Sequence, residues 1–175
     1  MSASEELQEG VEHAKEPFDK KVAVSMAIIA AFLAIVSVGV HYYTTEELLA
    51  QQQASDQWAY YQAKDIRRYE SEIAQDVLKA AEKESLGNRV QHYGQNSDRY
   101  DKERNEIQDK AREIEAERNL DGKRAFRLEF GEVFLEIGIV LASLAILAKM
   151  AKIWYLALLS AATGLAMSAT MLFIR

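Results

Sequence analysis

The sequence of 175 residues contains no cysteine, and its single proline lies at position 17. Without cysteine the chain cannot form disulfide bonds, thiolate nucleophiles or cysteine-ligated zinc and iron–sulfur sites. Residues 45–85 lack both proline and glycine and are rich in Ala, Glu, Gln and Lys, as a long helix requires. These absences exclude several kinds of chemistry and favour long helices.

The chain also lacks a concentration of positive charge. Its 21 Lys and Arg are outnumbered by 27 Asp and Glu, for a net charge of −6, and both signs are mixed along the middle of the chain. Binding to a phosphate backbone needs a concentrated basic stripe. We therefore expect no nucleic-acid partner.

Motifs of metal sites and of common enzyme classes are missing as well. The three histidines, His13, His41 and His92, are far apart and share no ligand-like spacing. The sequence has no phosphate-binding glycine loop, no nucleophile elbow and no His-Glu-x-x-His helix. We predict no metal, no cofactor and no enzymatic activity.

The sequence does contain apolar segments, and two of them are free of charge. Residues 22–40 and 153–174 are each about as long as the ~20 residues that cross ~30 Å of hydrocarbon. Trp154 and Tyr155 stand at the start of the second segment, where amphipathic rings favour the headgroup region. A cleaved signal peptide explains residues 22–40 less well, because the preceding tail is long and acidic and residues 37–41 make a poor cleavage site. Both segments are expected to span a membrane.

A third apolar segment, residues 131–148, carries Glu132 and Glu136 at its start. Residues 149–152 are too few to reach a distant site, but they suffice to turn this segment into an antiparallel neighbour of the next one. We therefore predict an all-α protein embedded in the lipid bilayer. Its three transmembrane helices follow an acidic tail (residues 1–21) and are expected at residues 22–40, 131–148 and 153–175.

Basic residues near the ends of these spans predict the orientation, because cytoplasmic loops retain Lys and Arg. Lys20 and Lys21 precede the first span, and Lys149 and Lys152 lie between the second and third. A basic cluster before the second span favours the opposite orientation; it comprises Lys123, Arg124 and Arg127. We expect a multi-pass protein of the bacterial cytoplasmic (inner) membrane, with its N-terminus inside and residues 41–130 on the periplasmic or extracytoplasmic side.

Residues 41–130 predict a long antiparallel, coiled-coil-like helical hairpin between the first two spans. Apolar residues recur at intervals of seven in both arms. Turn residues at positions 86–88, and a second set at Gly94 and residues 95–97, place the tip near residues 85–97. So thin a seam buries little, and self-association or a partner's helices would help to stabilise the hairpin. The seam between the arms is expected to contain Trp58, Ile66, Tyr69, Ile73, Tyr93, Tyr100, Ile107 and Ile114.

The aromatic residues of the first arm allow a second interpretation. Trp58, Tyr60, Tyr61 and Tyr69 could offer a stacking platform for a sugar or a peptide. Packing inside the hairpin is favoured, because the seam otherwise lacks bulky side chains.

Several short stretches of the sequence point to a family. The first arm contains Gln-Trp-Ala-Tyr-Tyr-Gln-Ala-Lys at residues 57–64, and the second contains Tyr-Asp-Lys-Glu at residues 100–103 and Ala-Arg-Glu-Ile-Glu at residues 111–115. The second apolar segment contains Leu-Glu-Ile at residues 135–137 and Leu-Ala-Ser-Leu at residues 141–144. In these stretches the chain resembles a bacterial membrane-protein family, domain-of-unknown-function family 4337. The resemblance implies three spans with a helical insertion, and it implies no activity and no site residue.

Glu132 and Glu136 are candidates for an ion or proton site. They lie one helical turn apart, so they share a face at the start of the second span. An unpaired carboxylate in hydrocarbon costs several kcal/mol, which makes intramembrane acids functional candidates. Interfacial acids that are solvated, or bonded to Ser and Thr, are the favoured interpretation, because the spans contain no Arg, Lys or His inside the membrane that would complete a relay.

A stripe of small residues in the third span predicts close helix packing. Packing within the three-span bundle and packing between subunits, which would support an oligomer, are both open. The stripe comprises Ser160, Gly164 and Ser168, and Gly138 and Ala142 form a matching strip on the second span.

Two functions fit these features. The first is an integral membrane structural or interaction protein, an oligomeric or accessory subunit whose hairpin mediates self-association or binding to a partner in a larger membrane complex. The alternative is an ion- or proton-conducting assembly that uses Glu136.

Overall fold

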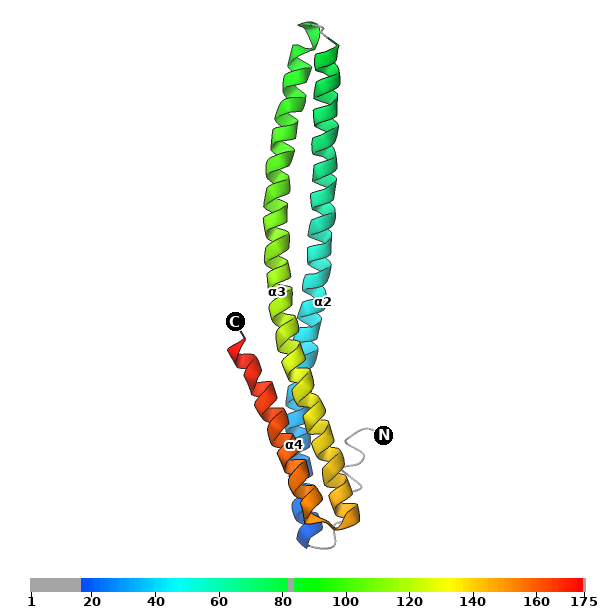
Figure 1. The fold of residues 1–175 in the computed structure, drawn as a ribbon, viewed down its shortest axis with the longest axis vertical. Coiled ribbons are helices and arrows are strands. Elements are labelled where there is room, and N and C mark those ends of the chain that lie inside the picture. Colours follow the sequence, from blue (N-terminus) through cyan, green and yellow to red (C-terminus); the bar gives the residue numbers. More distant parts are fainter. Residues whose placement is uncertain (1–16, 82–83, 175) are drawn as a thin grey trace. The chain divides into compact units, whose positions relative to one another are not determined.

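The computed structural model describes residues 17–81 and 84–174, which are almost entirely helical (Figure 1). Helix α2 runs over Pro17–Ala80, α3 over Gly87–Ala148 and α4 over Ala151–Ala169. Two short 3₁₀ segments, η1 at Glu84–Leu86 and η2 at Thr170–Phe173, complete the element order. The described residues contain no strand, and the predicted all-α fold is confirmed.

The ends of the helices follow from local chemistry. Pro17 is the first residue of α2, where its missing N–H breaks no helical hydrogen bond. Helix α3 ends where Lys149 adopts the left-handed conformation, with a φ of 54°. The Met150 N–H then donates to the carbonyl of Ala145 (3.3 Å) and the Lys149 N–H to that of Ile146 (3.4 Å), which is the Schellman ending of a helix. The turn between α3 and α4 therefore consists of Lys149 and Met150.

The chain divides into two compact units. The first draws on Met1–Glu46 and Leu120–Arg175, and the second is Glu47–Asn119. In the first unit, apolar side chains of α2, α3 and α4 form one core. Its buried members are Val22, Met26, Ile29, Val36, Val40, Leu128, Leu135, Ile139, Ala142, Ala145, Ala157 and Ala161.

The outer surface of the first unit is apolar as well. Each of the three helices contains a stretch long and apolar enough to cross a membrane, judged by length and composition. Large side chains of these stretches point outward: Ile35 is 69% exposed and Leu159 is 64% exposed. So much apolar surface suits hydrocarbon better than water. The structure is consistent with the predicted membrane protein.

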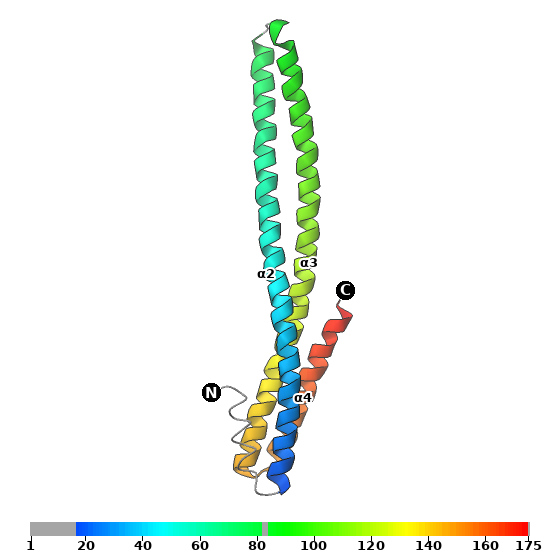
Figure 2. The same ribbon diagram turned by 180° about the vertical axis from the view of Figure 1, so that it is seen from behind.

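Contacts at both ends of the first unit show that successive helices run in opposite directions (Figure 2). At one end, the Lys149 ammonium of the α3–α4 turn donates to the Asp19 carboxylate at the start of α2, at 2.5 Å. At the other end, the Arg124 guanidinium of α3 lies 5.6 Å from the ring centre of Tyr43 and donates to the carbonyl of Ile174 at 3.5 Å. Helices α2 and α4 therefore start at the same end of the unit, and α3 starts at the other.

In the second unit, the later part of α2 and the earlier part of α3 lie side by side and antiparallel. The Trp58 indole N–H donates to the Glu115 carboxylate at 2.8 Å, and the Gln75 amide donates to the carbonyl of Val90 at 3.3 Å. Trp58 contacts a later residue of α3 than Gln75 does, so the two helices run in opposite directions. We refer to this part of the protein as the helical pair.

The break between α2 and α3 overlaps the first residues of the expected tip at residues 85–97. Helix α2 ends at Ala80 and α3 begins at Gly87, so residues 94–97 are helical. Gly94 is not a turn residue but a point of close approach, because a Cβ on Gly94 would lie 2.5 Å from the Gln75 amide nitrogen. Gly87, in contrast, has no such neighbour within 4 Å and stands where α3 starts.

Candidate interaction surface of the helical pair

The two arms of the helical pair are joined mainly by charged side chains. The Lys64 ammonium of α2 donates to the Glu103 carboxylate of α3 at 2.5 Å. The Asp65 carboxylate accepts from Arg104 across the pair at 2.8 Å and from Arg68 of its own helix at 3.3 Å. These side chains are only partly exposed, for example 15% for Arg68 and 28% for Asp65. Their ion pairs are therefore less screened by solvent than pairs on an open surface.

The ionisation of these groups follows from their partners. The Arg104 hydrogen bond, and to a lesser degree that of Arg68, lowers the pKa of Asp65 below its ordinary value. The hydrogen bond to Lys64 lowers the pKa of Glu103 in the same way, and Glu103 in turn raises the pKa of Lys64. All of these shifts favour the charged forms, so the network is ionised at neutral pH.

The apolar part of the contact between the arms is small. Ala54 and Ala111 are buried and, with their short side chains, allow the helices to approach closely. Ile107 is the one large aliphatic side chain of the pair that is buried, at 9% exposure, among the residues that the structure describes. Trp58 packs edge-on against Tyr61, with ring centres 5.5 Å apart. Charge pairs and small residues, rather than a large apolar seam, hold the two arms together.

Part of the predicted seam faces away from α3. Ile66 and Ile73 are 59% and 63% exposed, and Tyr69 is also exposed. Val77 extends the same face. The contact face of α2 is occupied instead by the ion-pairing residues around Lys64, which lie on the opposite side of the helix. We call Ile66, Tyr69, Ile73 and Val77 the outward stripe. The other predicted seam residues, Trp58, Tyr93, Tyr100, Ile107 and Ile114, are partly or fully buried.

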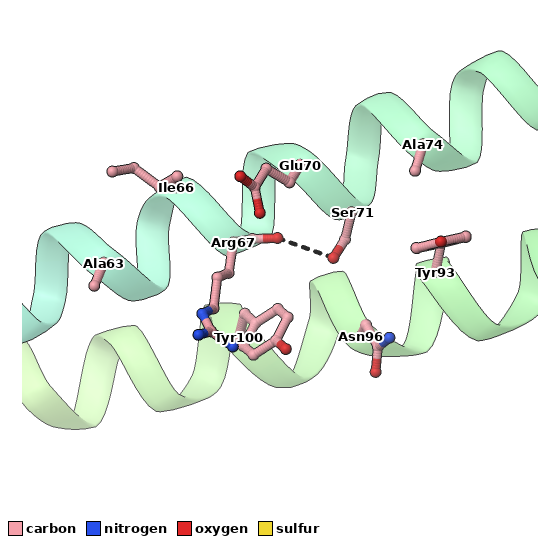
Figure 3. A pocket seen from close by; sticks show the side chains of 9 residues that line it. All are labelled: Ala63, Ile66, Arg67, Glu70, Ser71, Ala74, Tyr93, Asn96 and Tyr100. Carbon is pink, nitrogen blue, oxygen red and sulfur yellow. Dashed lines mark hydrogen bonds between the residues drawn. The ribbon is translucent and has the colours of Figure 1, made fainter.

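A groove runs beside the outward stripe, between the two arms (Figure 3). It has a volume of about 650 Å³, and Tyr93 and Tyr100 of α3 form its lower wall in the view of Figure 3. Arg67 reaches toward Tyr100, and the guanidinium groups of Arg67 and Arg99 lower the pKa of the Tyr100 hydroxyl. The residues that α2 contributes are Ala63, Ile66, Arg67, Glu70, Ser71 and Ala74.

A second, smaller groove of about 410 Å³ continues toward the end of α2 and shares Glu70, Ala74 and Tyr93 with the first. Ile73 and Val77 of the outward stripe line it, together with Arg89 of α3. The stripe and the two grooves adjoin one another: the smaller groove is mainly apolar, whereas Arg67, Glu70 and Asn96 make the larger one more polar.

The outward face of α3 has a different character. Its exposed residues between positions 95 and 110 are all polar or charged, as expected for a solvated face. They are Gln95, Asp98, Arg99, Lys102, Asn105, Glu106, Asp109 and Lys110. The apolar outward surface of the helical pair is thus a property of α2.

In the first unit, the candidate acids lie toward the outside of the bundle. Glu136 is exposed beside the exposed Ile137, and Glu132 is half-buried. No hydrogen bond or ion pair joins either carboxylate to another described residue. One chain therefore does not enclose Glu136 in an internal pathway.

The small-residue stripe packs α4 against α3 within one chain. The Ser160 hydroxyl donates to the carbonyl of Phe134 at 2.7 Å. A Cβ on Gly164 would lie 2.7 Å from the carbonyl oxygen of Gly131, so the two backbones touch there. Gly138 and Ser168 are buried in the same contact, and Ala142 is buried in the core of the first unit. Gly131 belongs to this contact although the spacing argument omitted it; its position seven residues before Gly138 was the available signal.

The described residues contain no group of three or more His, Asp or Glu side chains placed to hold a metal ion. Their most distinctive surface is the one built on the outward stripe.

Comparison with known proteins places the chain in a family. The family model described as "Domain of unknown function (DUF4337)" matches residues 18–174. The chain belongs to this family. The resemblance inferred from the motifs is confirmed. No curated protein and no solved structure matches the chain.

The DUF4337 match covers both units, including all of α3 and the outward stripe of α2. The helical pair is therefore part of the family's domain and not an addition to it. The family description names no activity.

Proposed function

We propose that this DUF4337 chain is a structural and interaction subunit of a membrane assembly. Its three apolar helical segments anchor it in the bilayer, and its helical pair forms a coiled-coil-like hairpin outside the bilayer that joins it to copies of itself or to another protein. The observation that supports this proposal is the outward stripe of α2, which is apolar and unpartnered in an otherwise charged pair of helices.

Burial of the outward stripe against another protein surface would be favourable in free energy. Removing apolar surface from water contributes roughly 25 cal/mol per Å². The stripe and the smaller groove present contiguous apolar surface, whereas the interior of the pair buries few large aliphatic side chains. Coverage of the stripe would supply the apolar burial that the pair lacks on its own.

We place the assembly in the bacterial cytoplasmic membrane, with the hairpin on the extracytoplasmic side. The support comes from basic residues, because Lys20 and Lys21 precede the first apolar segment and Lys149 and Lys152 adjoin the α3–α4 turn. The ion pair between Lys149 and Asp19 brings both groups to the same end of the first unit. A cytoplasmic location for that end agrees with the excess of Lys and Arg in the cytoplasmic loops of membrane proteins.

The test of assembly uses the full chain in its native membrane. Lysine-reactive cross-linking in intact membranes, followed by size analysis after gentle detergent extraction, should give species larger than the monomer. Only monomer, with no cross-linked protein of any kind, would contradict an interaction subunit.

A second candidate function is ion or proton conduction through an assembly that contains several copies of Glu136. The observation in its favour is that Glu136 is exposed on an apolar helix. Its carboxylate could therefore line a pathway only where several chains assemble and their Glu136 side chains face one another. In liposomes that contain the purified chain, Glu136→Gln should abolish any proton or cation flux. Glu129→Gln is a matched control, since Glu129 is exposed on the same helix but precedes the apolar segment. Absence of flux from the wild type, or equal flux from Glu136→Gln, would reject conduction.

A further inference from the structure

The basic cluster before the second apolar segment contains two side chains that the first unit does not use. Arg124 is used inside the unit, because it donates to the Asp121 carboxylate at 3.1 Å and lies over the ring of Tyr43. Lys123 and Arg127 lie one turn apart on α3, and both are exposed. No ion pair joins either of them to another residue that the structure describes. Together they form a positive patch on the surface of the first unit.

An aromatic and then an aliphatic surface follows this patch along α3. Phe130 stands seven residues after Lys123, and Ile137 and Leu144 continue the same interval. On a straight helix this interval drifts by only about 20° per repeat, so the four side chains follow one line along α3. All three apolar side chains are exposed, and so is Phe126, whose ring centre lies 4.6 Å from that of Phe130. The line therefore passes from positive charge through aromatic rings to aliphatic side chains.

The order of these side chains matches the depth profile of a lipid bilayer. At 1.5 Å per residue, α3 rises about 27 Å from Phe130 to its end at Ala148, which is close to the ~30 Å of hydrocarbon. From Lys123 to Lys149 the rise is about 39 Å, close to the thickness of about 40–45 Å that includes both headgroup regions. Aromatic rings favour the boundary between hydrocarbon and headgroups. Lys123 and Arg127 are therefore level with the phosphates of one leaflet.

The charge on this side of α3 favours one kind of lipid. With 3.6 residues per turn, the nearby acids Glu129, Glu132 and Glu136 lie on the opposite side of the helix from Arg127. The guanidinium fork of Arg127 suits a phosphate, and Lys123 adds a second positive charge one turn away. Phosphatidylcholine and phosphatidylethanolamine have an ammonium group that offsets their phosphate, whereas phosphatidylglycerol has none. Two neighbouring cations therefore favour the anionic phospholipid.

From these observations we infer that Lys123 and Arg127 bind the phosphate of an anionic phospholipid, whose acyl chain lies along Phe130, Ile137 and Leu144. This lipid site rests on the proposed function for its membrane location, but not for the partner of the helical pair. It holds a lipid whichever compartment this end of the first unit faces. The basic cluster then has a role other than setting the orientation of the chain.

Quenching of tryptophan fluorescence by brominated lipids tests the lipid site. The full chain carries Ile137→Trp as the reporter, with Trp58→Phe and Trp154→Phe to remove both native tryptophans. It is reconstituted into vesicles that contain phosphatidylcholine and phosphatidylglycerol in varied ratio, with bromine on the acyl chains of one of the two. The dependence of quenching on composition gives the relative affinity of the two lipids for the surface beside residue 137. We expect phosphatidylglycerol to bind about fivefold more tightly, the ratio that one Lys or Arg at a membrane surface contributes.

Removal of the positive patch should abolish this preference. In the reporter chain, Lys123→Gln with Arg127→Gln should lower the affinity ratio to about one. The matched control is Lys110→Gln with Arg112→Gln, which removes the same charge from exposed residues of α3 in the second unit and should leave the ratio at about five. Inorganic phosphate, compared with chloride at equal ionic strength, should also leave the ratio unchanged.

Equal affinity for the two lipids in the reporter chain, or an unchanged ratio without Lys123 and Arg127, would overturn the lipid site. An equal loss in the control would show that overall charge attracts the lipid, and a loss with inorganic phosphate would show that the cations bind a free anion; either result would also overturn the site. Cross-linked assembly in native membranes would still stand in these cases, since the vesicle assay does not involve the helical pair. If neither brominated lipid quenches the reporter, residue 137 does not lie in the bilayer, and the lipid site and the membrane assembly are overturned together.

Discussion

Asp65 is the side chain on which the ion pairs between the two arms converge. Its carboxylate binds Arg104 of the opposite helix and Arg68 of its own helix, and it is 28% exposed. Because the folded pKa of Asp65 is lowered, the network stabilises the helical pair while pH stays above the ordinary value of 3.8 for this group. The contribution is lost as pH falls further, through the lowered pKa of the folded state.

The replacement Asp65→Asn should therefore destabilise the helical pair by about 1 kcal/mol near neutral pH. The difference from the wild type should stay constant down to about pH 5 and shrink below about pH 4, because the unfolded wild-type chain then takes up a proton at Asp65 and the charged carboxylate stabilises the fold less. Thermal unfolding of the purified full chain, followed by far-ultraviolet circular dichroism, measures this difference.

Asp109→Asn serves as the control for Asp65→Asn. Asp109 is exposed on α3, and no ion pair joins it to another residue that the structure describes. Its replacement should leave stability within about 0.5 kcal/mol of the wild type. An Asp65 effect that is equal at all pH values would show that the ion pairs do not carry the stability.

At the scale of helices, α3 and α4 are held together by direct contact of their backbones. A Cβ on Gly131 would overlap the Ser168 hydroxyl and lie 2.8 Å from the carbonyl oxygen of Gly164. The carbonyl belongs to the backbone of α4, so it can yield only if the helices separate. This contact therefore depends on glycine at position 131.

Gly131→Ala should weaken the packing of α4 and cost about 1–3 kcal/mol. The measurement is unfolding by sodium dodecyl sulfate, followed through the fluorescence of Trp154 in a Trp58→Phe background. Gly39→Ala is the matched control in an apolar segment, because its Cβ would meet only the flexible end of Leu128, at 3.1 Å. If both replacements have equal effects, close approach of α3 and α4 is not what Gly131 provides.

Helix content could be predicted from the sequence, but the neighbours of each helix face could not. Residues 45–85 have no helix breaker, and the structure accordingly continues α2 to Ala80. The seven-residue interval identified one apolar line on α2 correctly, yet periodicity contains no information on what packs against that line. The charged residues around Lys64 form the contacts with α3, so Ile66 and Ile73, on the opposite side of α2, remain exposed.

Glycines illustrate the same limit at two positions. Gly94 belongs to a sequence pattern typical of turns, but it lies inside α3. There the lack of a Cβ leaves room for the side chain of Gln75. Gly131 stands among apolar residues, and only the position of α4 shows that a Cβ would not fit there. Glycine occurs both in turns and where another chain segment comes too close for a side chain, and only the fold shows which of the two applies.

For the molecule as a whole, the ion pair between Asp19 and Lys149 limits the possible topologies. It places the start of α2 and the α3–α4 turn at one end of the first unit. Arg124 and Ile174 meet at the other end. If the first unit lies across a bilayer, the start of α2 and the residues next to Lys149 face the same compartment, and the end of α4 faces the opposite one.

Labelling of intact cells with a membrane-impermeant thiol reagent determines which compartment each end faces. Single cysteines at Ser4, Asn88 and Ala151 each report one position, and the native chain adds no background because it has no cysteine. We expect labelling at Asn88 alone, since Lys20, Lys21, Lys149 and Lys152 favour a cytoplasmic location for both Ser4 and Ala151. Permeabilised cells, in which all three cysteines should react, control for access. Labelling of Ser4 and Ala151 with Asn88 protected would invert the orientation and place any partner of the helical pair in the cytoplasm. Opposite results at Ser4 and Ala151 would contradict the prediction of three crossings, which puts the N-terminus and the turn between the second and third spans on the same side.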